Sequence, residues 1–243
     1  MRIARTVIAA MTAATLVTAC SAVPRSPEPL PTDYVPVVAT ETPQAQGNLS
    51  PDGFTQAQRM TVRVRNVGCT QLKTGTGFAY DGRTLITNRH VIENTRELQV
   101  TTYDGRTVEV TAASATTVAD LAIITIDESI GVGAVLAQQD PVEGDPISVV
   151  GYPKGGRLTT VTGVVLGSTS DPLGAALGSV LATSAPVEPG SSGSPVLNER
   201  GEVVGVIYAK NDSEQSFMVP VSMLRSLLDQ EQLMVPQDQS CSN

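Results

Sequence analysis

The sequence has 243 residues and a formal net charge of −8, from 16 lysines and arginines against 24 aspartates and glutamates. This charge disfavours a basic surface for phosphates, and aromatic residues, at 3%, are too few for base stacking, so we expect no nucleic-acid partner. The chain contains one histidine, His90, which excludes a zinc site built on two or more imidazoles. We expect no metal and no cofactor.

Residues 1–19 are typical of a secretory signal peptide. Arg2 and Arg5 precede an apolar stretch at 7–19 that is too short to span a bilayer comfortably. The run Leu-Val-Thr-Ala-Cys at 16–20 resembles the lipobox of bacterial lipoproteins, in which the cysteine becomes the first mature residue and carries the lipid. The resemblance implies that Cys20 anchors the protein to the membrane outside the cytoplasm. With an ordinary cleaved signal and an incidental cysteine, the protein would be secreted.

Residues 20–60 are expected to form an extended tether between the lipid and the folded part. Positions 21–60 hold seven of the 16 prolines and few large apolar side chains, a composition typical of semi-rigid linkers. A pro-segment is the alternative.

From residue 61 onward, short β-type runs alternate with turns, which predicts an all-β domain over 61–243. Asp-Gly pairs at 81–82 and 104–105 are hairpin signals within the first group of strands. That group is expected at 61–67, 75–80, 84–87, 98–102, 107–113 and 121–126.

A second group of strands follows the Asp-Pro pair at 140–141. It is expected at 147–150, 159–168, 179–183, 195–197, 203–209 and 216–219. Helical spacing at 222–228 then predicts a helix that Ser222 caps.

Two groups of about six strands predict two packed six-stranded antiparallel barrels. The first would cover 61–139, the second 140–220, and a C-terminal helix and tail 221–243. Periodicity alone fits a single β-sandwich almost as well.

Two cysteines, Cys69 and Cys241, leave an even count once Cys20 carries lipid. Because an exported chain meets an oxidising compartment, we expect a disulfide between them. Two free thiols are the alternative.

Three short runs carry residues suited to acyl transfer. A serine hydroxyl needs a neighbouring base, and histidine fits that role because its ordinary pKa lies near neutral. A buried carboxylate must orient the imidazole, and two backbone N–H groups must bind the developing oxyanion. The runs are Thr-Asn-Arg-His-Val-Ile at 87–92, Ala-Asp-Leu-Ala-Ile-Ile at 119–124 and Pro-Gly-Ser-Ser-Gly-Ser-Pro at 189–195.

Together with Gly-Thr-Gly-Phe at 75–78 and Gly-Glu-Val-Val-Gly at 201–205, these runs resemble the chymotrypsin-like (trypsin-fold) serine proteases, most closely the bacterial HtrA/Deg type. The resemblance covers about residues 60–235 and implies two six-stranded barrels with the site in the cleft between them. It implies that His90 is the general base, that Asp120 orients it and that Ser192 is the nucleophile. The N–H groups of Gly190 and Ser192 would form the oxyanion hole. An α/β-hydrolase site is a poor fit, because no histidine follows Ser192.

The chain departs from the family pattern at two positions beside the nucleophile. Ser191 stands where Asn or Asp is common, and Ser194 stands where Gly is common. Trypsin-like zymogens pair an Asp before the nucleophile with a new N-terminus, so Ser191 argues against that activation here. Because the chain ends soon after the predicted helix, we also expect no PDZ domain.

Position in the fold places the specificity pocket near 184–188 and the substrate-pairing strand near 207–210. Pro186 stands about where trypsin has its basic-selecting carboxylate, so cleavage after Lys or Arg is not favoured. We expect a modest apolar residue before the scissile bond. The substrate-binding candidates are Pro186, Ile207, Tyr208 and Ala209.

The expected function is therefore an exported, membrane-tethered serine endopeptidase that acts on proteins or peptides through an acyl-enzyme. The alternative is a catalytically inactive lipoprotein of the same fold that binds peptides or a protein partner.

Overall fold

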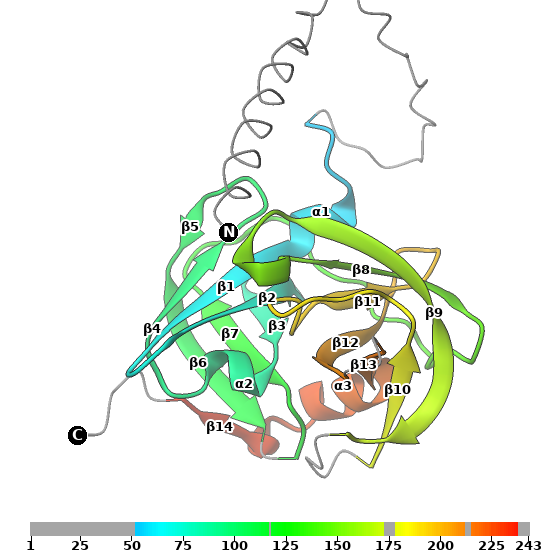
Figure 1. Ribbon diagram of the computed structural model, residues 1–243. Helices are drawn as coiled ribbons and strands as arrows, with labels where there is room; N and C mark the ends of the chain where they lie inside the picture. The colour runs from blue at the N-terminus through cyan, green and yellow to red at the C-terminus, as the bar shows by residue number, and fades with distance from the viewer. Residues whose placement is uncertain (1–51, 117, 173–177, 212–214, 238–243) are drawn as a thin grey trace, which may run out of the picture. The chain divides into compact units, whose positions relative to one another are not determined.

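The structure, a computed structural model, describes residues 52–116, 118–172, 178–211 and 215–237 (Figure 1). The expected signal peptide, Cys20, most of the tether and Cys241 lie outside the described residues. The folded part begins before the expected boundary at 61, with helix α1 (Gln56–Met60). Thr55 and Gln58 form a capping box that starts this helix, and Met60 is buried.

The first group of strands forms one antiparallel sheet. Its order is β14-β6-β7-β3-β2-β1-β4-β5. Apolar and polar side chains alternate along β1. Val62 and Val64 are fully buried, whereas the next residue, Arg65, is exposed. The strands are β1 (Thr61–Gly68), β2 (Leu72–Ala79), β3 (Thr84–Thr87), β4 (Thr95–Thr101), β5 (Thr107–Val108), β6 (Val110–Thr116), β7 (Ala122–Ile126) and β14 (Met234–Pro236).

The second group closes into a six-stranded antiparallel barrel with the order β10-β13-β12-β11-β8-β9. Figure 1 shows it beside the first sheet, with β9 as its long outer strand. Strands β11 and β13 are buried along their whole length, and β12 is buried except at its last two residues. The strands are β8 (Pro146–Gly151), β9 (Thr159–Ser170), β10 (Ser179–Thr183), β11 (Pro195–Leu197), β12 (Val203–Lys210) and β13 (Ser216–Pro220).

The two halves share a core. One hydrophobic cluster runs from Phe78 in the first sheet to Tyr208 in the barrel and to Leu224 in helix α3 (Val221–Leu228). A second cluster fills the barrel around Val196 and Met218. Because each half contributes to one continuous cluster, the loops between the halves are held in fixed positions.

Helix α3 follows β13, as expected, but its cap differs from the prediction. Pro220 occupies the N-cap position and makes no side-chain cap bond. The carboxylate of Asp140, from the connection between the halves, accepts hydrogen bonds from Ser222 N–H at 2.8 Å and Ser222 Oγ at 2.6 Å. A negative charge at a helix N-terminus is favourable, so Asp140 takes over the role expected of Ser222.

The prediction of an all-β, trypsin-like fold with a C-terminal helix is confirmed. The second barrel is closed and six-stranded as predicted, whereas the first half, expected as a six-stranded barrel, is an eight-stranded sheet. The number of strands differs because the run expected at 107–113 breaks into β5 and β6, and because β14 returns to pair with β6. Three short helices complete the described part: α2 (Arg89–Ile92), and the 3-10 turns η1 (Pro153–Gly155) and η2 (Glu231–Leu233). Within the described ranges, no helix is long and apolar enough to cross a membrane.

Candidate active site

His90 lies in the short helix α2, directly after strand β3. Val91 and Ile92 are buried and anchor this turn to the core, while 40% of the His90 side chain remains exposed. The amide of Asn66, buried in β1, donates to the carbonyl of Val91 at 2.9 Å and to that of Glu93 at 3.0 Å. These bonds satisfy carbonyls at the end of the helix and tie its backbone to strand β1.

Asp120 lies two residues before β7 and is only 5% exposed. Its Oδ2 lies 2.6 Å from His90 Nδ1, and its Oδ1 accepts the backbone N–H of His90 at 3.0 Å. The side-chain amide of Asn88 donates to the carbonyl of Asp120 at 2.6 Å. One carboxylate therefore holds both the ring and the backbone of His90, as an orienting group should.

Ser192 lies in the loop at 188–194, which comes from the second barrel. Its carbonyl accepts the backbone N–H of Thr76 in β2 at 2.8 Å. A Cβ on Gly75 would lie 2.6 Å from the side chain of Val91 and 3.2 Å from Ser192 O. The absence of a side chain at Gly75 thus lets the Ser192 loop and the His90 turn approach the same strand. In the described part of the chain, no hydrogen bond joins Ser192 Oγ to His90.

The loop keeps this shape through two glycines with positive φ. Gly190 has φ +98° and Gly193 has φ +87°, conformations that side chains rarely adopt. A Cβ on Gly190 would lie 2.7 Å from both Lys154 N and Tyr152 O. The loop is therefore pressed against the turn at 152–156.

The Gly190 N–H group is available to a ligand. The carbonyl of Pro189 accepts the backbone N–H of Lys154 at 2.6 Å. In a trans peptide the C=O and the following N–H point in opposite directions, so this bond turns Gly190 N–H away from Lys154. Across the described residues, Gly190 N–H finds no acceptor. Lys154 itself has φ +56°, unusual for a residue with a side chain.

The Ser192 N–H group is available in the same way. The carbonyl of Ser191 accepts the N–H of Ser194 at 3.0 Å, which turns Ser192 N–H in the opposite direction. Ser191 and Gly193 use their own N–H groups on Glu188 O and Ile207 O. Of the N–H groups at 190–194, only those of Gly190 and Ser192 lack a partner in the described structure.

The two serines that depart from the family pattern are both buried. Ser191 is 6% exposed and Ser194 is fully buried. Within the described residues, the Ser194 hydroxyl has no hydrogen-bond partner, and it faces the backbone of Gly151 in β8. Ser194 therefore fills space that a glycine would leave open.

The substrate-binding candidates lie in different surroundings. Pro186 is exposed, Ala209 is half-buried, and Ile207 and Tyr208 are buried. Ile207 N–H donates to Ser194 O and its carbonyl accepts Gly193 N–H, so its backbone pairs with the nucleophile loop.

Tyr208 points into the core and not toward solvent. Its hydroxyl donates to Asp171 Oδ1 at 2.7 Å. Burial and this hydrogen bond to a carboxylate raise the pKa of Tyr208. Tyr208 thus anchors the loop after β9 instead of presenting a ring to a ligand.

Sequence reasoning singled out candidate site residues but missed the residues that surround and support them. Thr76, Lys154 and Ile207 hold the 188–194 loop through contacts between residues 13 to 116 positions apart along the chain. The Pro-Lys-Gly-Gly run at 153–156 signals a turn, but no local pattern reveals which backbone groups the turn will bind.

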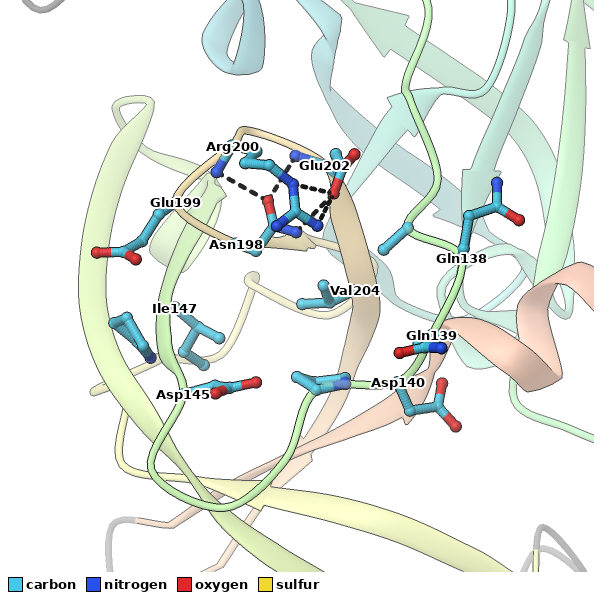
Figure 2. Close-up of a pocket in the computed structure, with 13 residues that line it drawn as sticks. Gln138, Gln139, Asp140, Asp145, Ile147, Asn198, Glu199, Arg200, Glu202 and Val204 are labelled. Atoms are coloured by element: carbon cyan, nitrogen blue, oxygen red, sulfur yellow. Dashed lines mark hydrogen bonds and ion pairs between the residues drawn. The ribbon is translucent and has the colours of Figure 1, made fainter.

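A hollow of about 370 Å³ lies on the barrel, and no predicted site residue lines it. Figure 2 shows that three of its polar side chains bind one another: Glu202 Oε2 accepts bonds from Arg200 and from Asn198 at 2.6–2.9 Å. Among the residues the structure describes, no cluster of His, Cys, Asp and Glu side chains could hold a metal ion.

The predicted disulfide is not tested by these contacts, because Cys241 lies outside the described residues. It stays a prediction, as does the lipid on Cys20.

Comparison with known proteins agrees with the geometry. Residues 75–206, more than half of the chain, match the family described as trypsin-like peptidase domain. The serine protease Do-like HtrA of Bacillus subtilis is 29% identical over 208 residues, covering 80% of this chain and 45% of that protein. The probable periplasmic serine endoprotease DegP-like of Chlamydia pneumoniae is 32% identical over 165 residues, covering 64% of this chain and 34% of that protein.

The fold has a close counterpart among solved structures. The active form of the Rv3671c protease from M. tuberculosis superimposes with a TM-score of 0.66 at 24% identity, covering 76% of this chain and 86% of that one. The chain spans less than half the length of the two curated relatives above. On its sequence match and its fold, the chain belongs to the trypsin-like peptidase family, as a relative of the HtrA/Deg serine proteases.

Proposed function

We propose that this protein is an exported serine endopeptidase in which His90, Asp120 and Ser192 form the catalytic triad. The observation that carries the proposal is the Asp120 carboxylate, which is nearly fully buried and binds both Nδ1 and the backbone N–H of His90. That arrangement supports a ring whose Nε2 is the free basic atom.

Acylation begins when Ser192 Oγ attacks the scissile carbonyl carbon and its proton passes to His90 Nε2. The carbonyl electrons move onto oxygen, where the N–H groups of Gly190 and Ser192 bind the oxyanion. His90 then gives the proton to the leaving amine, the C–N bond breaks, and an ester on Ser192 remains.

Deacylation repeats these steps with water. His90 removes a proton from the water as its oxygen attacks the ester carbonyl, and the second oxyanion forms in the same place. The C–O bond to Ser192 breaks, and His90 returns the proton to Ser192 Oγ. Asp120 keeps its charge throughout and stabilises the imidazolium.

The substrates proposed are proteins or peptides with a modest apolar residue before the scissile bond. The segment at 184–188 is the proposed pocket, and its neighbouring hydroxyls are already paired: Thr183 Oγ1 and Ser216 Oγ lie 2.7 Å apart, and Ser216 Oγ donates to Ala185 O at 2.9 Å. These hydroxyls carry no charge, and Glu188, the one ionisable residue of the segment, has its Oε2 3.8 Å from Lys154 Nζ. The pocket therefore presents no unpaired charge to a Lys or Arg side chain.

We also propose that the protein works outside the cytoplasm, anchored by a lipid on Cys20. The signal-like residues 1–19 support export, as does the likeness to a relative described as periplasmic. Mass spectrometry of the N-terminal peptide from membranes tests this: diacylglyceryl-modified Cys20 is expected, and an unmodified N-terminus elsewhere would refute it.

Labelling with a fluorophosphonate tests the enzymatic proposal, because this reagent phosphonylates an activated serine. The folded full chain should label, Ser192→Ala should not, and Ser191→Ala should still label as the matched neighbour. A folded chain that neither labels nor cleaves unfolded casein would refute the proposal and favour the inactive, peptide-binding alternative.

A further inference from the structure

Thr76 is a fully buried residue of the first sheet that makes two hydrogen bonds to the 188–194 loop. Its hydroxyl lies 2.8 Å from the carbonyl oxygen of Gly190 and 2.9 Å from the backbone nitrogen of Tyr152. Its own backbone N–H donates to Ser192 O at 2.8 Å. One residue of the first half thus bonds both residues whose N–H groups face the proposed oxyanion, through its side chain at Gly190 and through its backbone at Ser192.

The direction of the hydroxyl bond is fixed by chemistry. Tyr152 N–H is always a donor, so Thr76 Oγ1 accepts from it. The single hydroxyl proton is then free to be donated to Gly190 O, which is an acceptor only. Since all three groups are buried, neither bond is exchanged for water.

These bonds fix both peptide units that flank Gly190. Lys154 N–H holds the carbonyl before it, on Pro189, and the Thr76 hydroxyl holds its own carbonyl. Gly190, at φ +98°, has no side chain to restrict rotation of these units. The two bonds therefore replace the restriction that a side chain would supply.

Thr76 also connects the loop to the segment that carries His90. The hydroxyl of Thr87, three residues before His90, donates to the carbonyl of Thr76 at 2.6 Å. The 188–194 loop and the segment that carries the proposed base are thus both hydrogen-bonded to the same buried residue.

We propose that Thr76 is a positioning residue for the oxyanion hole: its hydroxyl holds the peptide unit after Gly190 while Lys154 N–H holds the unit before it, and together they keep Gly190 N–H facing the developing charge. This inference rests on the proposed function. Thr76 touches no substrate, so its effect should appear in the transition state and not in substrate binding.

The test compares three variants. Thr76→Val keeps the shape of the side chain and removes the hydroxyl, Thr76→Ser keeps the hydroxyl, and Thr61→Val is the matched control. Thr61 is also fully buried, and its hydroxyl donates to a backbone carbonyl, Ala57 O, at 2.7 Å, but it has no contact with the loop.

The readouts are the second-order rate constant of fluorophosphonate labelling and the kcat and KM for fluorescent casein. Thr76→Val should label and turn over about 10- to 100-fold more slowly, as expected when an orienting bond to a buried carbonyl is lost, with KM within about 2-fold. In Thr76→Ser, the labelling rate and kcat should return to within about 3-fold of wild type. In Thr61→Val, both should stay within the same range, although its loss of thermal stability should be similar to that of Thr76→Val.

Three outcomes would overturn the inference: a folded Thr76→Val as fast as wild type, a Thr76→Ser as slow as Thr76→Val, or a Thr61→Val equally slow. If Thr76→Val does not fold, Thr76→Ala is measured in its place against the same limits. A wild-type protein that never labels refutes the proposed function itself, and this inference with it. A wild type that labels while Thr76→Val is unimpaired refutes this inference alone.

Discussion

Replacing Asp120 by Asn tests whether this carboxylate sets the tautomer of His90. Asp120→Asn keeps the shape of the side chain and removes its charge. The carboxylate accepts two hydrogen bonds from His90, one from the backbone N–H at 3.0 Å and one from Nδ1 at 2.6 Å. An amide has a single acceptor oxygen and cannot accept both.

Each orientation of the amide opposes catalysis. If its oxygen stays on the His90 backbone N–H, its NH₂ group faces Nδ1, the ring proton moves to Nε2, and Nε2 no longer accepts a proton from Ser192. If the amide turns over, its NH₂ group faces the backbone N–H, donor against donor. We expect kcat to fall about 10⁴-fold, as this change does in other triads, equal to about 5.5 kcal/mol of transition-state stabilisation.

The assay is steady-state hydrolysis of fluorescent casein, with thermal unfolding to show that each variant is folded. The matched control is Asp140→Asn, because Asp140 also accepts two hydrogen bonds, from Ser222, far from the site. Asp140→Asn should keep kcat within about 2-fold while costing roughly 1 kcal/mol of stability. A folded Asp120→Asn that keeps more than a tenth of wild-type kcat would refute the tautomer argument.

Three further predictions concern stability. Among the described residues, the buried Tyr152 hydroxyl has no hydrogen-bond partner, whereas the Tyr208 hydroxyl donates to a carboxylate. In urea unfolding, Tyr152→Phe should therefore be at least as stable as wild type, and Tyr208→Phe should be less stable by about 1–2 kcal/mol. The reverse order of stability would contradict this reading. Burial raises the pKa of Tyr152 to about 12, so the folded state favours the neutral phenol. The contribution of this neutral phenol to the free energy of unfolding should be complete below about pH 10 and should be lost as the pH rises toward 12. In the same urea experiment, Tyr152→Phe should lose less stability over this pH range than wild type. Finally, non-reducing peptide mapping of exported protein should find Cys69 linked to Cys241, and two alkylated free thiols would disprove the link.

The strands and the candidate site residues could be read from the sequence because both depend on local patterns. Alternating apolar residues mark β1 and the apolar run at 203–209 marks β12, both within a residue or two of the observed ends. His90 was singled out because it is the only imidazole and lies in a run typical of the family. In each case the signal lies within about ten residues.

The features that escaped prediction depend on contacts between distant residues. The cap of α3 comes from Asp140, 82 positions before Ser222, so the local pattern pointed to the wrong side chain. Strand β14 is only three residues long and ends in Pro236, so its sequence indicates an irregular tail. It forms a strand because β6, far away in the sequence, pairs with it. Thr76 likewise reads as an ordinary strand residue.

Strand β14 has a consequence for how the protein is made. It pairs with β6, with Val235 opposite Ala115, although the whole second barrel lies between them in the sequence (Figure 1). While the chain is being synthesised, that edge of β6 stays unpaired until residues 234–236 arrive. Contacts of such long sequence separation slow folding, and an open strand edge invites pairing with other chains. We expect C-terminal truncation before residue 234 to cause aggregation during synthesis, even though no residue of the proposed triad is removed.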